Sequence, residues 1–159
     1  MGILKVKDYY TKDPVVITRD TSLRKISDII LKSKYSVIPV VNDENECIGI
    51  VTVSELLSVF IPEYLDLFGD IEFALNIEFE LEISAFIDDL IIAEDILSTE
   101  YPLITPETNI VFAVAQLNKF KLNGVPVVDE EGKVQGIITL KDIISGLICY
   151  KNSCPVDFI

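Results

Sequence analysis

The chain has 159 residues, half of them apolar, and its 13 basic and 26 acidic side chains give a net charge of −13. Such a composition suits one ordinary domain or two small ones that share a core, and the charge disfavours nucleic acid as a partner. The chain has no His, so the usual general base and the commonest metal ligand are missing, which excludes most hydrolase triads and zinc sites. No apolar run approaches the roughly 20 residues that cross a bilayer, so no membrane insertion is expected.

The three cysteines, Cys47, Cys149 and Cys154, are an odd number and form no CxxC pair. The first residues also lack the apolar segment of a signal peptide. Together these features predict a reducing, cytoplasmic location. Each Cys is expected to be an apolar filler or a tail residue, and neither a disulfide framework nor a metal site is predicted.

The first predicted unit, residues 1–60, begins with a short helical turn. A strand that ends in Thr18 follows, and residues 20–22 (DTS) supply the N-cap of an amphipathic helix. A Pro-containing strand and a second strand then form a hairpin across a polar turn, and a second helix closes the unit. The expected strand, helix, strand, strand and helix lie at residues 15–18, 23–30, 37–41, 47–52 and 54–60.

Residues 61–92 form an acidic linker that holds nine Asp and Glu side chains among Leu, Ile and Phe. A loop of this length seldom lacks structure of its own, so short amphipathic helices are predicted, although residues 76–81 also fit a strand. The linker is either a solvated connector that covers a core edge or a protein-docking surface. It lacks the residue spacing of a calcium-binding loop.

The second predicted unit, residues 93–150, repeats the first at a constant offset of 87 positions (139 − 52), and residues 151–159 form a tail. No gap is needed along the repeat. Scattered apolar matches could arise from periodicity alone, but Pro, Gly and Thr in register indicate a duplication. The expected elements of the second unit lie at residues 103–105, 110–117, 125–128, 134–139 and 141–148.

Each unit ends in a motif that is typical of a polar ligand site. Residues 136–142 read GIITLKD, so Thr139 ends a strand and Asp142 opens a helix, beside the backbone N–H groups of its N-terminus. The counterpart at residues 49–55 reads GIVTVSE. Pro cannot donate to a strand ladder, so Pro39 and Pro126 mark strand edges that are either simple edges or edges that face a ligand.

These duplicated units, with a Pro-bearing strand and a Gly-hydrophobic-hydrophobic-Thr-x-x-acid ending, resemble a tandem pair of CBS (cystathionine-β-synthase) domains, also called a Bateman module. The resemblance covers about residues 6–60 and 93–148. It implies an α/β (α+β) fold of two pseudo-symmetric β-α-β-β-α units packed sheet to sheet, with two clefts between them and a homodimeric assembly. Family members commonly bind adenine nucleotides or adenosyl compounds and regulate an attached or partner protein.

The resemblance places parts of both units in each cleft. In the stronger cleft the Asp142 carboxylate would accept two hydrogen bonds from a ribose diol, each worth about 1.5–3 kcal/mol. The residues implied for this cleft are Thr18, Arg19, Val37, Ile38, Pro39, Thr139, Lys141 and Asp142. Those implied for the second cleft are Thr52, Glu55, Thr105, Gly124, Val125 and Pro126. Glu55 departs from the family's Asp, and its extra methylene moves the carboxylate by roughly 1.5 Å, so weaker binding is expected there.

The expected function is therefore a regulatory module that senses an adenosyl compound and transmits its binding to a partner protein. Basic residues are scarce at the expected phosphate end, so AMP, adenosine or S-adenosylmethionine is favoured over a triphosphate. The alternative is an interaction module with degenerate clefts that docks through residues 61–92. No nucleophile–base pair is visible, so neither an enzyme nor a catalytic cofactor is expected.

Overall fold

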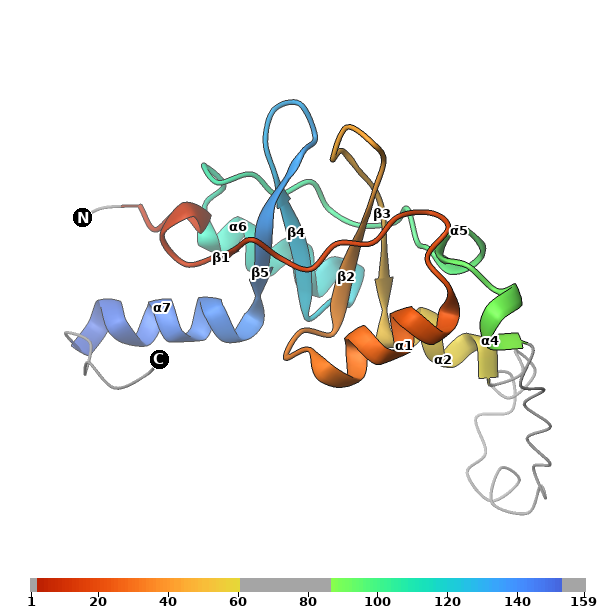
Figure 1. Cartoon of the computed structure of the whole chain (residues 1–159). Coiled ribbons are helices and arrows are strands. Elements are labelled where there is room, and N and C mark those ends of the chain that lie inside the picture. Colours follow the sequence, from red (N-terminus) through yellow and green to blue (C-terminus); the bar gives the residue numbers. More distant parts are fainter. Residues whose placement is uncertain (1–2, 61–86, 153–159) are drawn as a thin grey trace, which may run out of the picture.

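The computed structural model describes residues 3–60 and 87–152, which form two similar α/β units side by side (Figure 1). A three-stranded sheet has the order β1-β5-β4, and a two-stranded sheet pairs β2 with β3. The expected mixed α/β fold is confirmed, while most of the acidic linker (61–86) and the end of the tail (153–159) lie outside the described residues. The elements are η1 (Val6–Asp8), β1 (Thr11–Lys12), α1 (Leu23–Lys32), β2 (Val37–Val41), β3 (Cys47–Thr52), α2 (Val53–Phe60), α4 (Ile87–Leu90), α5 (Ala93–Ile96), α6 (Ile110–Phe120), β4 (Gly124–Val128), β5 (Val134–Thr139) and α7 (Leu140–Asn152).

The two predicted hairpins have the same antiparallel register. Val37 pairs with Thr52 in the first hairpin, and Gly124 pairs with Thr139 at the equivalent place in the second. The Thr that ends each hairpin therefore lies opposite the start of the Pro-containing strand. Both hairpin turns use a left-handed residue at the same offset, Asn45 with φ 64° and Gly132 with φ 82°.

The first strand of each unit is shorter than the sequence predicts. Residues 15–18 and 103–105 each form a single parallel bridge, from Ile17 to Val40 and from Ile104 to Val127. The Ile17 N–H donates to the carbonyl oxygen of Pro39 at 3.0 Å. Pro39 itself has no N–H to offer at this edge, so a full ladder cannot form there.

The leading segment of each unit crosses over and pairs with the other unit. Thr11 of β1 pairs with Ile137 of β5, and at the same offset Ser98 pairs with Ile50 of β3. A strand of one unit thus completes the sheet of the other. The sequence does not reveal this exchange, because each repeated unit is one continuous stretch of chain.

The two hydrophobic cores reflect the same exchange. Val6 is fully buried in the second unit's core, together with residues of α6 and β4. Its counterpart Ala93 is fully buried in the first unit's core, together with Ile26 of α1. Each unit therefore needs the other's leading segment to complete its core, and the two are expected to unfold together.

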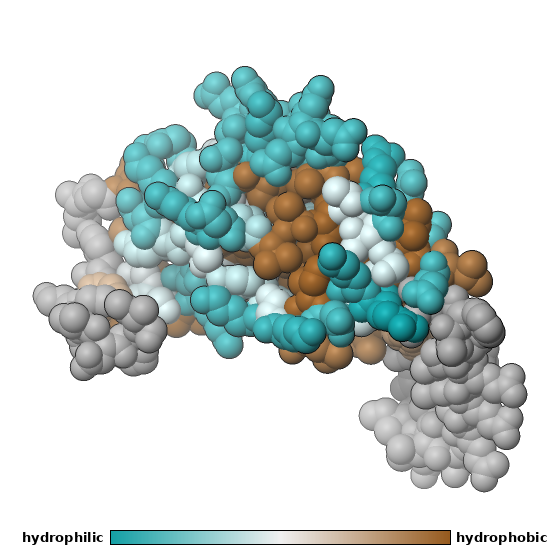
Figure 2. Space-filling view, viewed as in Figure 1, coloured by the Kyte–Doolittle hydropathy of each residue, from teal (hydrophilic) through white to brown (hydrophobic). Residues whose placement is uncertain are grey.

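The sheets of the two units pack against each other, as expected. Val37, Ile50 and Ile137 form a buried cluster between them. At the hairpin tips, the Cys47 N–H donates to the Gly132 carbonyl at 2.9 Å, and the two turns are thereby pinned together. On the face in Figure 2, hydrophobic residues gather in the middle, below hydrophilic hairpin tips.

Two further observations bear on the sequence expectations. Cys149 on α7 is disulfide-bonded, so it is not the simple apolar filler that was expected. Within the described part of the chain, no helix is both long and apolar enough to cross a membrane.

The helix caps occur where the sequence predicts them. The Asn109 side chain accepts a hydrogen bond from the Val111 N–H at 2.8 Å, and Ser22 Oγ accepts one from Lys25 N–H at 3.3 Å. Each bond satisfies a backbone donor that the helix itself leaves unpaired.

Asn109→Ala is expected to lower the free energy of unfolding by about 1 kcal/mol, because the first turn of α6 loses its cap. Urea unfolding followed by circular dichroism would measure the change. Asn118→Ala, on the exposed surface of the same helix, is the matched control and should change stability by less than about 0.5 kcal/mol. Equal losses in both variants would show that the cap contributes nothing.

Candidate functional site

Asp142 is anchored by a single carboxylate oxygen. Its Oδ2 accepts hydrogen bonds from the Thr139 N–H at 2.9 Å and from the Thr139 hydroxyl at 2.8 Å, while Thr139 Oγ1 accepts one from the Asp142 N–H at 3.2 Å. The motif is therefore a local cap at the start of α7. No described residue hydrogen-bonds to the other oxygen, Oδ1, which remains available as an acceptor in a half-buried position.

Asp142 lines a cavity of about 520 Å³ whose walls come from both units. Three of the residues implied for the stronger cleft line it from the β5–α7 junction: Thr139, Lys141 and Asp142. Opposite them lie Lys34, Tyr35 and Ser36, in the loop between α1 and β2, with Asn123, just before β4, and Leu140 completing the wall. A cavity of this size fits a nucleoside-sized ligand.

The α1–β2 loop was not predicted to line this cavity. Residues 34–36 precede the first Pro-containing strand, and Asn123 precedes the second at the corresponding place. Both loops reach the cavity because β2 and β4 lie next to each other. At the start of these strands, the Val37 side chain packs against Gly124. The shared position before each Pro-strand was the available signal.

The other residues implied for this cleft lie outside the Asp142 cavity. Thr18 is exposed, and its hydroxyl donates to Asp20, which lowers the pKa of that carboxyl. Arg19 forms an exposed ion pair with Glu94 at 3.1 Å. The three strand residues are buried: Val37, Ile38 and Pro39. Val37 lines a small pocket of about 110 Å³ between the two units.

Glu55 repeats the local geometry of Asp142 at the start of α2. Its Oε2 accepts a hydrogen bond from the Thr52 N–H at 2.8 Å and another from the Thr52 hydroxyl. The longer side chain thus reaches back to the same cap partners. Glu55 lines a separate cavity of about 380 Å³, together with Ser98, Glu100 and residues 119–122.

The remaining residues implied for the second cleft are divided between pocket and core. Thr52 and Gly124 line the small central pocket. The Thr105 N–H donates to the Thr108 hydroxyl at 3.0 Å, and the Thr18 N–H donates to the Thr21 hydroxyl in the same way. Both hydrogen bonds stabilise turns. Val125 and Pro126 are buried. In the described part of the chain, no three His, Cys, Asp or Glu side chains gather as a metal site.

The Tyr35 hydroxyl is an unusual feature of the Asp142 cavity wall. It is buried and has no hydrogen-bond partner, and no other side-chain polar atom in the described residues shares this condition. An unpaired buried hydroxyl costs about 1–3 kcal/mol, so a partner from a ligand would relieve a real penalty.

Tyr35→Phe is expected to leave the free energy of unfolding unchanged or to raise it by up to about 1 kcal/mol, because it removes the unpaired hydroxyl. Tyr101→Phe is the matched control. The Tyr101 hydroxyl donates to the Cys47 carbonyl at 3.3 Å, so its removal should cost about 1 kcal/mol. Urea unfolding of both variants checks the prediction, and a clear loss in Tyr35→Phe would contradict it.

Comparison with known proteins identifies the architecture. The CBS domain family matches this chain twice, at residues 6–61 and 93–148, which together cover most of its length. The chain is a tandem pair of CBS domains. Both matches enclose a Thr-x-x-acid motif and a Pro-containing strand.

Among the relatives, a similar CBS pair makes up nearly a whole protein in one case and only a part of a larger protein in another. An uncharacterized protein of Methanocaldococcus jannaschii is 29% identical over 92% of this chain and 92% of its own length. Inosine-5'-monophosphate dehydrogenase of Aquifex aeolicus is 28% identical over 89% of this chain, but the match spans only 24% of that enzyme. This CBS pair therefore covers about a quarter of the dehydrogenase it resembles.

Solved structures share the fold at lower identity. CBSX2 in complex with AMP has a TM-score of 0.70 and 22% identity, covering 93% of this chain and 98% of its own. CBSX2 from Arabidopsis thaliana gives a TM-score of 0.72 at 20% identity, covering 96% and 100%. The CBS pair of protein MJ0100, in complex with 5'-methylthioadenosine and S-adenosyl-L-methionine, gives 0.68 at 22% identity, covering 95% and 100%.

Proposed function

We propose that this CBS pair is a non-catalytic regulatory module that binds an adenosyl compound in the Asp142 cavity and transmits that binding to a partner protein. The free Oδ1 of Asp142 carries the proposal. It lies in a cavity of nucleoside size, on a carboxylate whose other oxygen is held rigid by Thr139. A ribose diol supplies two hydroxyl donors that suit such an acceptor.

The walls of the cavity suit a ligand that joins the two CBS units. Lys34 and Tyr35 belong to the first unit, and Thr139 and Asp142 belong to the second. A ligand that contacts both walls stabilises this relative position of the two CBS units. Regulation follows only if the ligand favours one arrangement over another, because equal affinity for two states shifts neither. The ligands of CBSX2 and MJ0100 support the adenosyl class.

The module is also proposed to act as a homodimer. The outer surface of α7 exposes apolar side chains, with Ile144 56% and Ile148 51% exposed, and α2 exposes Leu57 to 49%. Covering these side chains by a second copy would remove apolar surface from water. Sedimentation equilibrium is expected to give twice the 17.8 kDa mass of the chain, and a stable monomer at micromolar concentration would contradict it.

A thermal-shift and calorimetric titration tests the ligand proposal. The wild-type chain would be titrated with adenosine, AMP, ADP, ATP, 5'-methylthioadenosine and S-adenosylmethionine. A ligand present at a hundred times its dissociation constant should add about 2.7 kcal/mol to the free energy of unfolding. Stabilisation by at least one of these compounds is expected, with GMP as the control for base selection. No stabilisation by any of them would overturn the proposal.

A further inference from the structure

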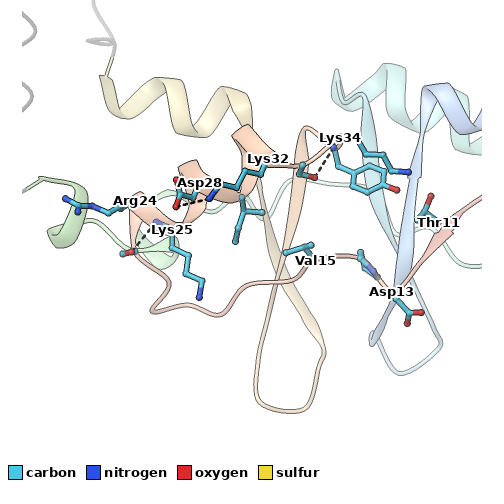
Figure 3. Close-up of a pocket in the computed structure, with 13 residues that line it drawn as sticks. Thr11, Asp13, Val15, Arg24, Lys25, Asp28, Lys32 and Lys34 are labelled. Carbon is cyan, nitrogen blue, oxygen red and sulfur yellow. Dashed lines mark hydrogen bonds and ion pairs between the residues drawn. The ribbon is translucent and has the colours of Figure 1, made fainter.

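A second and larger cavity adjoins the Asp142 cavity. It measures about 790 Å³ and lies between α1 and the chain segment that precedes it. The two cavities share Lys34 and Tyr35 in their walls. Figure 3 shows Lys25 and Lys32 projecting from α1, with Val15 on the segment that crosses beside it. We call this space the α1 cavity.

The α1 cavity is basic, although the chain as a whole is acidic. The first 34 residues hold eight of the 13 basic side chains but only four of the 26 acidic ones. The cavity is lined by four basic side chains against two acidic ones: Arg24, Lys25, Lys32 and Lys34 against Asp13 and Asp28. A surface of this kind attracts an acidic partner, while the net charge of −13 repels an extended polyanion such as a nucleic acid.

Several of these cations have little intramolecular use for their charge. Among the described residues, neither Lys25 nor Lys34 is in an ion pair, and Lys34 lies 5.3 Å from the centre of the Tyr35 ring. The ion pair of Lys32 with Asp28 is exposed and has a separation of 3.6 Å. Exposed pairs of this kind are weak, so a carboxylate from another molecule can compete for Lys32.

The α1 cavity also presents apolar surface beside its cations. Val15 is 51% exposed, and Pro14 and Ile29 line the same space. A small inorganic anion would leave these side chains in contact with water. A peptide that carries both acidic and apolar side chains covers the apolar surface and neutralises the lysines together.

The spacing of two lysines fits an extended peptide. Lys25 and Lys32 both belong to α1, and seven helical positions place them on one face, about 10 Å apart along the helix axis. In a polyproline II segment, side chains three residues apart share one face and lie about 9 Å apart. Two acidic side chains at that spacing therefore meet both lysines from a single extended segment.

The duplication shows that this lining is particular to the first unit. At the 87-residue offset, Lys25 and Asp28 correspond to Phe112 and Ala115. Phe112 is 53% exposed, so the equivalent helix surface on α6 is apolar. The repeated architecture therefore does not require a basic surface on this helix, and the charge of the α1 cavity calls for an explanation of its own.

We propose that the α1 cavity is a docking site for an acidic, extended segment of the partner protein, with carboxylates on Lys25 and Lys32 and an apolar side chain on Val15. The inference rests on the proposed function for the existence of that partner. The shared Lys34–Tyr35 wall links the two sites, because a ligand in the Asp142 cavity touches side chains that also line the α1 cavity. Such a coupling is reciprocal, so the segment changes the ligand's affinity by the same factor.

Fluorescence anisotropy with a labelled 12-residue peptide of four Glu-Leu-Pro repeats, at 50 mM NaCl, tests this proposal. The wild type is expected to bind it at least about tenfold more tightly than the matching Gln-Leu-Pro peptide, because carboxylates form charge-assisted hydrogen bonds with lysine. Lys25→Gln/Lys32→Gln should lose at least about tenfold in affinity for the acidic peptide. Val15→Ser should lose at least about threefold, because the Leu side chains lose an apolar contact.

Lys7→Gln/Lys133→Gln is the matched control, because it removes the same charge from two side chains outside both cavities, each paired with a Glu on the surface. Its affinity for the acidic peptide should remain within about twofold of the wild type. Urea midpoints of all variants establish that each is folded.

Four outcomes would overturn the inference. The first is no binding of the acidic peptide by the wild type, and the second is an equal loss in the Lys25/Lys32 variant and in the control variant. The third is a 12-nucleotide single-stranded DNA that binds as tightly as the peptide, which would indicate a general polyanion surface. The fourth is peptide affinity that rises at least about tenfold when the seven carboxylates of residues 61–86 are neutralised, because the chain's own linker would then be the occupant.

Failure of this inference is distinguishable from failure of the proposed function. If an adenosyl compound binds the wild type but the peptide does not, only the docking site fails. If no adenosyl compound binds, the proposed function fails whatever the peptide does. When both bind, the saturating adenosyl compound should shift the dissociation constant of the peptide by at least about fivefold, and an unchanged constant would contradict the link through the Lys34–Tyr35 wall.

Discussion

Asp142→Ala is expected to weaken AMP binding by at least about 100-fold, because the ribose loses two hydrogen bonds to a carboxylate that contribute about 1.5–3 kcal/mol each. Titration calorimetry of the folded variant measures the loss directly. The effect should appear in the dissociation constant for every adenosyl compound that binds the wild type, since all of them carry the same ribose diol. AMP binding at wild-type affinity in Asp142→Ala would show that the ribose lies elsewhere.

The duplication supplies a matched control for this variant. Glu55 accepts the same two hydrogen bonds from Thr52 that Asp142 accepts from Thr139. Both Asp142→Ala and Glu55→Ala should therefore lose a helix cap, at a cost of about 1 kcal/mol in the free energy of unfolding. Only Asp142→Ala should lose AMP affinity. Equal loss of AMP binding in the two variants would indicate that the caps, rather than the ribose contact, are responsible.

Gly136→Ala is expected to cost about 3 kcal/mol in the free energy of unfolding, because the new methyl group cannot be accommodated. Gly136 lies in β5 opposite Lys12 of β1. A Cβ at this position would overlap the carbonyl oxygen of Thr11 and the ring of Tyr10. A backbone oxygen in a sheet cannot move aside cheaply, so β1 must separate from β5. Urea unfolding measures the loss.

Gly49→Ala is the control, since Gly49 occupies the equivalent place in β3. There the closest atom to an added Cβ is the flexible end of Leu97, at 2.6 Å. A side chain can rotate away, so a loss of about 1 kcal/mol is expected. Equal stability losses in the two variants would show that the β1–β5 pairing adds nothing.

Local features of this CBS pair were predictable from the sequence. The caps at Ser22 and Asn109 and the hairpin registers follow from residues within a few positions of one another. The bonds between Thr139 and Asp142 are of the same kind, because a side chain that opens a helix meets backbone groups three residues away. The constant offset of 87 then extended each local prediction to the second unit.

The exchange of leading segments could not be predicted in this way. Nothing near Thr11 in the chain indicates that its partner is Ile137 rather than a strand of its own unit. Strand pairing depends on which edges meet after the cores have packed, and a short segment such as β1 carries too little pattern to specify its partner. Val6, which precedes β1 in the chain, is buried in the second unit's core and so keeps β1 close to β5.

The residues of the candidate site are likewise of two kinds: those that local sequence predicts, and those that only tertiary packing brings to the site. The sequence by itself determined the duplicated CBS architecture and the Thr139–Asp142 pair, because hydrogen bonds within a turn need only neighbouring residues. Only the tertiary structure placed Lys34 and Tyr35 opposite Asp142, left Thr18 and Arg19 outside that cavity, and gathered basic side chains beside it. A cavity and its local charge arise where segments far apart in the chain pack together, and a net charge of −13 does not show where the positive residues lie.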